Sequence, residues 1–161
     1  TKIYLRRGED RLQFWKDDSI WIGAPTAELE TLADSTKDWN HVSYVLFVGY
    51  SDYWVVLGGD ASERTWESIY AVWGDWMKRA DVKILKASHH GRDTGYHQPS
   101  VAALEPEYTI ISVGRLPDTD ASNKYRQYSK VYTTRYHGNI KAQLWYDGDV
   151  WLHDAKGRRI N

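Results

Sequence analysis

The stretch Ala80-Asp-Val-Lys-Ile-Leu-Lys-Ala-Ser-His89-His90-Gly91 places two adjacent histidines and a glycine directly after an apolar, partly β-branched segment. Short runs of this composition are typical of strands, so we expect a strand over residues 82–87. Its carboxyl end would then present imidazole nitrogens, and the glycine would let a metal ion or a substrate approach the backbone. The segment therefore predicts both a sheet and a candidate site at its edge.

A second stretch upstream, Tyr53-Trp-Val-Val-Leu-Gly-Gly59-Asp60, repeats this arrangement with a carboxylate. Imidazole and carboxylate are ligands that suit Zn²⁺ and neighbouring metals. Two other interpretations stay open from these residues alone. Residues 60–63 have the Asp-x-x-Glu shape of a capping box, so Asp60 would cap the following helix. Adjacent histidines in a loop are also often simply solvated or hydrogen-bonded.

The order of apolar segments predicts an α/β fold. Strands are expected over residues 43–50 and 53–57, a helix that ends near Ala80, then the strand over 82–87, a short helix over 99–104 and a strand over 108–113. This alternation is typical of a sheet with flanking helices. The long helix is recognised by a buried stripe at helical spacing, which consists of Trp66, Ile69, Tyr70, Trp73, Trp76 and Met77.

The two ends of the chain are predicted to be simpler. Near the N-terminus, short strands are expected over residues 3–5, 12–15 and 19–22, followed by a surface loop over 26–40 with one helical turn at 29–32. The C-terminal part is predicted to form a hairpin over 140–144 and 150–152, turning at Tyr146-Asp-Gly-Asp149.

Composition narrows the functional classes. A chain of 161 residues with a formal net charge of -1 has no global field that would attract nucleic acid or an anionic membrane. It contains no cysteine, which excludes disulfides and thiolate metal sites, and no apolar run approaches the ~20 residues of a membrane span. We leave the compartment open and favour the cytoplasm. The chain starts at Thr1, and we expect it to be part of a longer protein.

Aromatic residues are abundant, with nine tryptophans and twelve tyrosines, and most of them are expected to pack in the core. Residues 115–136 interleave tyrosines with basic side chains. This composition would suit binding of single-stranded nucleic acid, but a solvated loop and helix has the same composition, and we favour that interpretation.

Taken together, these segments resemble the metallo-β-lactamase superfamily, and within it the hydrolase domains of the competence proteins that take up DNA. The resemblance covers nearly the whole chain. It is carried by the pattern from Asn40 to Phe47, by Gly58-Gly59-Asp60, by Ser88-His89-His90-Gly91, by Pro106-Glu-Tyr108 with Ser112-Val-Gly114, and by Val131 to Thr134 with Gly138.

One departure qualifies the resemblance. The His-x-His-x-Asp-His cluster that defines the superfamily is absent from this sequence. The chain therefore resembles the C-terminal half of such a domain, with residues 1–161 as a single unit. The resemblance implies half of an αββα sandwich, a mixed sheet with flanking helices, and a partner in the missing N-terminal half of the same domain.

The resemblance also implies a site and an activity. Asp60 and His89 would be zinc ligands at a centre of one or two Zn²⁺ ions, His90 would be catalytic, and Lys86 and Ser88 would contact substrate. The implied activity is metal-dependent hydrolysis of a phosphodiester or nucleic-acid-like substrate, with the chain alone inactive.

The alternative is a non-catalytic scaffold or binding module with an incomplete metal site. An isolated half-domain would expose apolar faces and strand edges, so this alternative includes a homo-oligomer.

Overall fold

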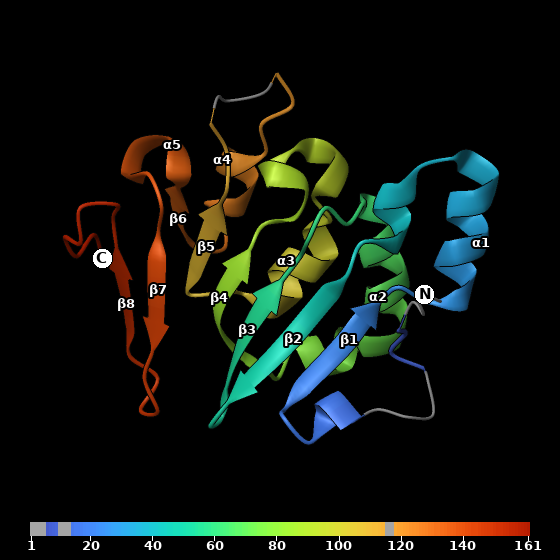
Figure 1. The fold of residues 1–161 in the computed structure, drawn as a ribbon, viewed down its shortest axis with the longest axis horizontal. Coiled ribbons are helices and arrows are strands. Elements are labelled where there is room, and N and C mark those ends of the chain that lie inside the picture. Colours follow the sequence, from blue (N-terminus) through green and yellow to red (C-terminus); the bar gives the residue numbers. More distant parts are fainter. Residues whose placement is uncertain (1–5, 10–13, 115–117) are drawn as a thin grey trace, which may run out of the picture.

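The computed structural model describes residues 6–9, 14–114 and 118–161, and it shows an α/β fold built on a mixed sheet (Figure 1). Six strands lie in the order of the sequence. The first three are antiparallel neighbours, and the third to the sixth are parallel. The strands are β1 (Ile20–Ala24), β2 (Val45–Tyr50), β3 (Tyr53–Leu57), β4 (Asp81–Lys86), β5 (Tyr108–Ile111) and β6 (Lys130–Thr133).

Helices and a hairpin complete the fold. The α-helices are α1 (Ala27–Thr36), α2 (Glu63–Met77), α3 (Gln98–Leu104), α4 (Ser122–Tyr125) and α5 (Thr134–His137). Short 3-10 turns are η1 (Phe14–Lys16), η2 (Trp39–Val42), η3 (Ser88–Gly91) and η4 (Asp93–Gly95). The strands β7 (Lys141–Leu144) and β8 (Val150–His153) form a separate antiparallel pair.

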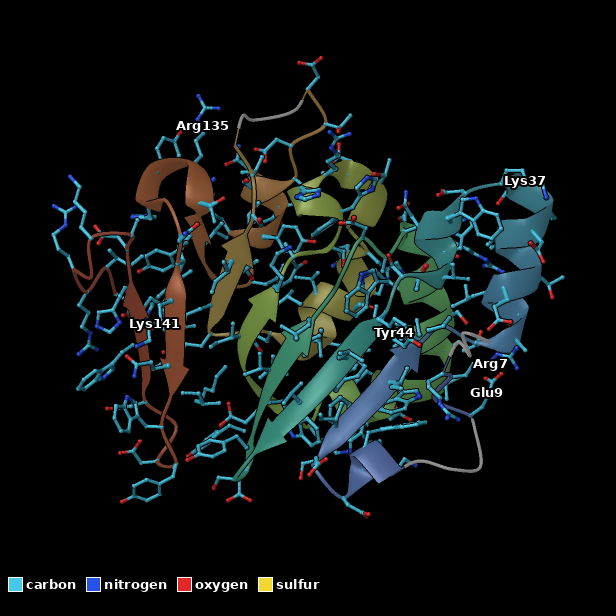
Figure 2. All side chains as sticks on the ribbon, in the orientation of Figure 1. Arg7, Glu9, Lys37, Tyr44, Arg135 and Lys141 are labelled. Carbon is cyan, nitrogen blue, oxygen red and sulfur yellow. The ribbon has the colours of Figure 1, made fainter. Side chains whose placement is uncertain are left out.

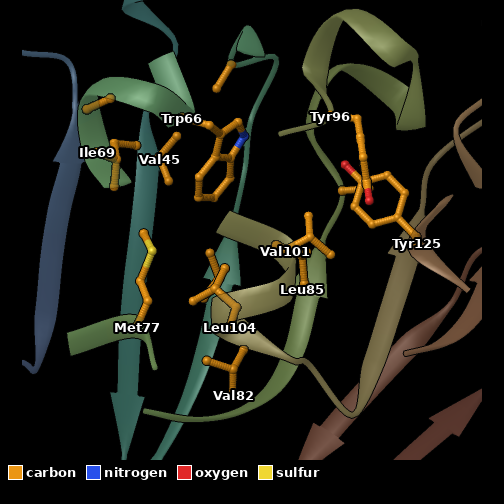
Figure 3. Packing of buried hydrophobic residues seen from close by; sticks show 14 of the residues in the cluster. Val45, Trp66, Ile69, Met77, Val82, Leu85, Tyr96, Val101, Leu104 and Tyr125 are labelled. Atoms are coloured by element: carbon orange, nitrogen blue, oxygen red, sulfur yellow. The ribbon is translucent and has the colours of Figure 1, made fainter. Parts of the chain in front are cut away.

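The main core lies between the sheet and α2, α3 and α4 (Figure 3). The predicted stripe of α2 is confirmed, because Trp66, Ile69 and Met77 are buried there and the other members pack against them. The indoles of Trp54, Trp73 and Trp76 meet Phe47 and one another mainly edge to face, an arrangement that adds to the area they bury. Most of the aromatic excess therefore serves packing.

A second core lies on the opposite face of the sheet. Ile84 of β4 and Tyr108 of β5 are buried against Val150 and Leu152 of the hairpin. Leu85 and Ile111 of the same two strands belong to the main core, because side chains along a strand alternate between the two faces of the sheet. The hairpin thus covers the parallel part of the sheet from the side away from α2.

The sequence predicted the strands β1 to β5, the helices α2 and α3, and the hairpin. It was wrong about residues 26–40, which contain the ten-residue helix α1. Thr26 caps this helix by accepting a hydrogen bond from the amide of Leu29, and only Leu29 and Ala33 are buried. So sparse an apolar stripe gives little helical signal.

The N-terminal strands expected over residues 3–5 and 12–15 lie largely outside the described residues. Residues 3–5, and 12–13 of the second strand, lie outside the described residues, while Trp15 belongs to η1 rather than to a strand. No helix among the described residues is long and apolar enough to cross a membrane.

The main core makes the stability depend on one face of α2. Replacing Ile69 (2% exposed) by alanine should lower the free energy of unfolding by about 2–5 kcal/mol, because it opens a cavity against the sheet. Val72→Ala removes a side chain that is 77% exposed on the same helix, and should change stability by less than about 0.5 kcal/mol. Urea unfolding of both variants measures the difference, and equal effects would contradict this assignment of the core.

Candidate functional site

The carboxyl ends of β3 and β4 lie side by side because the two strands are parallel neighbours. Past the last pair, Leu57 with Lys86, the backbone contacts continue: the amide of Gly58 donates to the carbonyl of Lys86 over 3.1 Å. The amide of His89 then donates to the carbonyl of Gly59, also over 3.1 Å. The Gly-Asp and His-His segments, about thirty residues apart in sequence, therefore meet at one edge of the sheet.

A buried hydroxyl locks this edge. Ser88 is 1% exposed, and its Oγ accepts a hydrogen bond from Trp66 Nε1 at 2.8 Å and donates to the carbonyl of Gly58 at 3.0 Å. A Cβ at Gly58 would lie 2.2 Å from this Oγ, so glycine is needed here for close approach. Ser88 thus ties β3, β4 and α2 together, and its hydroxyl is engaged inside the protein.

Asp60 is not the cap of α2. Ser62 holds that position, with its Oγ accepting from the amide of Thr65 at 3.2 Å and lying 2.7 Å from His41 Nδ1. The capping-box interpretation of Asp60 is therefore wrong. The side chain of Asp60 is 50% exposed, and its Oδ1 lies 3.6 Å from His90 Nε2.

His90 is oriented by the end of the next strand. Its Nδ1 lies 2.8 Å from the carbonyl oxygen of Ser112, just past β5. A carbonyl only accepts, so Nδ1 carries the proton, and in the neutral ring Nε2 keeps its lone pair. That lone pair is on the nitrogen nearest Asp60.

The histidine pair also has a strained backbone. His89 and His90 have φ values of 45° and 56°, in the left-handed region that non-glycine residues rarely adopt. Such residues cost about 1–3 kcal/mol each and cluster at functional sites. The strain turns the two rings in different directions: His90 toward Asp60, and His89 toward Thr94, whose Oγ1 lies 2.9 Å from His89 Nδ1.

Lys86 adds a cation to the same edge. Its Nζ donates to the carbonyl of Ala87 at 2.7 Å. Burial lowers the pKa of Lys86, and the negative charge of Asp60 opposes that shift. The lysine is therefore within electrostatic reach of the carboxylate.

The pair Asp60 and His90 passes a simple test for metal binding. Two N or O ligands at 2.0–2.2 Å from a tetrahedral metal are separated by about 3.3–3.6 Å. The 3.6 Å between Oδ1 and Nε2 fits this spacing, and a carbonyl partner on the far nitrogen is the usual support of a histidine ligand. Within residues 6–9, 14–114 and 118–161, however, no group of three or more His, Cys, Asp or Glu could hold a metal ion.

Sequence reasoning missed Thr94 and the role of the Ser112 carbonyl. The second had a signal, since Ser112 lies near the end of the apolar strand expected over residues 108–113. The orientation of His90 depends on backbone angles that no sequence pattern announced.

The described part of residues 115–136 offers no continuous aromatic surface. Tyr125 is buried in the main core beside Tyr96. Lys124 pairs with Asp93 at 2.8 Å and lies over the ring of Tyr96. The residues that looked suited to nucleic acid are largely occupied by internal contacts.

Comparisons with known proteins add no relative: no family model, no curated protein and no solved structure matches this chain.

The lock formed by Ser88 predicts a cost for its removal. Ser88→Ala should lower the free energy of unfolding by about 1–3 kcal/mol, because Trp66 Nε1 loses its acceptor and the Gly58 carbonyl loses a donor in a buried place. Ser35→Ala, at an exposed serine, is the control and should stay within about 0.5 kcal/mol. Denaturant unfolding checks both, and a neutral Ser88→Ala would refute the lock.

Proposed function

We propose that this chain provides part of a hydrolytic metal centre, with Asp60 and His90 as two of its ligands. The observation that carries the proposal is the 3.6 Å separation of Asp60 Oδ1 and His90 Nε2, together with the carbonyl that fixes the other ring nitrogen. Both side chains are about half exposed at the edge of the sheet, so further ligands and a substrate have access to them.

The proposal gives the histidines other roles than the resemblance implied. His90, rather than His89, is the ligand beside Asp60. His89 lies next in the chain with its Nδ1 toward Thr94, and we assign it to the contact with substrate or to a second metal. Ser88 positions the edge through its internal hydrogen bonds.

When bound, a divalent metal ion supplies a water of near-neutral pKa and polarises the bond to be cleaved. The residues of this chain do the rest. Asp60 and His90 hold the centre at the strand ends, and the partly buried ammonium of Lys86 favours an anionic substrate at the same edge. The positive charges of a bound metal ion and of Lys86 suit a phosphodiester. The metallo-β-lactamase resemblance suggests the same substrate class.

Two ligands do not make a tight zinc site, because tight sites use three or four protein ligands. We propose that the remainder comes from a segment with the His-x-His-x-Asp-His pattern, in a preceding half of the same αββα sandwich.

A second candidate function is a non-catalytic scaffold. The observation that favours it is that the described residues contain no group of three or more His, Cys, Asp or Glu that could hold a metal ion. In that case the Asp60 and His90 pair would be an ordinary surface ion pair, which contributes little to stability.

Zinc binding separates the two functions. We expect isothermal titration with Zn²⁺ to show weak binding to this chain, and the affinity to fall by about tenfold or more in Asp60→Ala and in His90→Ala. His137→Ala, at a partly exposed histidine of α5, is the matched control and should leave the titration unchanged. Zinc binding that survives in both site variants would contradict the proposed ligands.

Activity is tested on the longest natural chain that contains these residues. With Zn²⁺ or Mn²⁺ added, it should hydrolyse bis-p-nitrophenyl phosphate, and Asp60→Ala should abolish turnover. Absence of turnover, with no change on mutating Asp60, would support the scaffold instead.

A further inference from the structure

The outer face of the C-terminal hairpin is a second feature without an assigned role. Val150 and Leu152 of β8 point inward to the core. Because side chains alternate along a strand, Trp151 and His153 point outward, together with their β7 partners Gln143 and Lys141.

The C-terminal tail adds a third row to this face. The amide of Ile160 donates to the carbonyl of Leu152 at 2.9 Å, and Asn161 Oδ1 accepts from the amide of Leu152 at 2.8 Å. A bridge pairs Arg159 with His153. Lys141, His153 and Arg159 therefore lie in one line across three adjacent segments, which we call the basic row.

Two exposed indoles lie beside the basic row. Trp145 and Trp151 are 42% and 36% exposed, and their ring centroids are 5.3 Å apart. The guanidinium of Arg159 lies 5.0 Å from the centroid of Trp151. Indoles in a core are fully buried, whereas Trp145 and Trp151 remain partly exposed at the surface beside Arg159.

The hairpin is rigidly anchored, so this face is preorganised. Tyr53 of β3 donates through its hydroxyl to the carbonyl of Asp147 at 2.9 Å. The ring of Tyr53 also lies so close to Gly148 that a Cβ there would be 2.5 Å from it. A binding surface held in this way loses little conformational entropy on binding.

The C-terminal part of the chain is locally positive, although the chain as a whole is not and the hairpin itself carries Lys141 against Asp147 and Asp149. Residues 126–161 contain seven lysines and arginines but three aspartates, within a chain of formal net charge -1. Asp154 is turned away into a pair with Arg158 at 2.7 Å, while Asp147 and Asp149 belong to the turn. The cations of the basic row that are exposed to a ligand are Lys141 and Arg159.

We propose that this outer face binds single-stranded nucleic acid, with bases stacked on Trp145 and Trp151 and phosphates along the basic row. Surfaces that bind single strands combine two components: cations that contact the nucleic-acid backbone, and exposed aromatic rings on which the bases stack. Unstacked bases fit better than a duplex, because a duplex hides its base faces. Figure 2 shows Lys141 and the hairpin at the side of the sheet, apart from Tyr44, whose carbonyl adjoins Gly59 at the Asp60 edge. The inference therefore does not rest on the metal centre.

The test is fluorescence anisotropy with a 5′-fluorescein-labelled dT20 oligonucleotide at low salt, in the presence of EDTA so that no metal ion bridges phosphate to Asp60. Trp151→Ala should weaken binding about tenfold, the scale of one lost base-stacking contact. Lys141→Ala should lower the slope of log K against log salt by about 0.7, as expected for one lost phosphate contact with a single strand. Circular dichroism checks that each variant is folded.

Matched controls make the result specific. Trp39→Ala and Lys78→Ala remove an exposed indole and an exposed lysine elsewhere, and both should bind dT20 as the wild type does. Asp60→Ala should also leave dT20 binding unchanged, so the two proposals fail separately.

Three outcomes would overturn the inference: no binding of dT20, equal binding by Trp151→Ala and wild type, or binding to phosphatidylglycerol vesicles without binding to dT20. The second would show attraction by charge alone, and the third would point to a membrane surface.

Discussion

The buried hydroxyl of Ser88 is the contact on which the candidate site depends. It joins an indole of α2 to the carbonyl of Gly58, and so fixes the end of β4 against the end of β3. A polar group at this depth is costly unless it is satisfied, and here both of its hydrogen bonds are made. The glycine at 58 is a consequence, since the hydroxyl occupies the space of a Cβ.

From this fixed point the backbone of the histidine pair follows. The amide of His89 is held by the Gly59 carbonyl, and His89 and His90 both adopt positive φ before the chain leaves the sheet edge. Strain at two consecutive non-glycine residues persists only where the surroundings impose it. As a result, Nδ1 of His90 donates to the carbonyl of Ser112, and Nε2 of the same ring faces Asp60. The strained backbone thus sets the direction of the His90 imidazole.

The sequence predicted what depends on periodicity and failed where long-range contacts decide. Apolar strands and the stripe of α2 were recognisable, and parallel pairing then brings Asp60 and the histidines to one edge. Helix α1 was missed because only Leu29 and Ala33 are buried in it. The sequence left Asp60 open as a metal ligand or as the cap of α2. The cap is Ser62, since both positions carry capping side chains and only the tertiary contact with His41 favours the second. Which of the two histidine rings faces Asp60 depends on backbone angles that sequence does not reveal.

The central claim is that the fold holds His90 with Nδ1 donating to Ser112 and Nε2 facing Asp60. Long-range ¹H–¹⁵N NMR of the histidine side chains at neutral to mildly alkaline pH tests it most directly, because it distinguishes the protonated from the unprotonated ring nitrogen. The account predicts a proton on Nδ1 of His90, and an Nε2 resonance that shifts when Zn²⁺ is added. A proton on Nε2, or an Nε2 resonance indifferent to Zn²⁺, would contradict it.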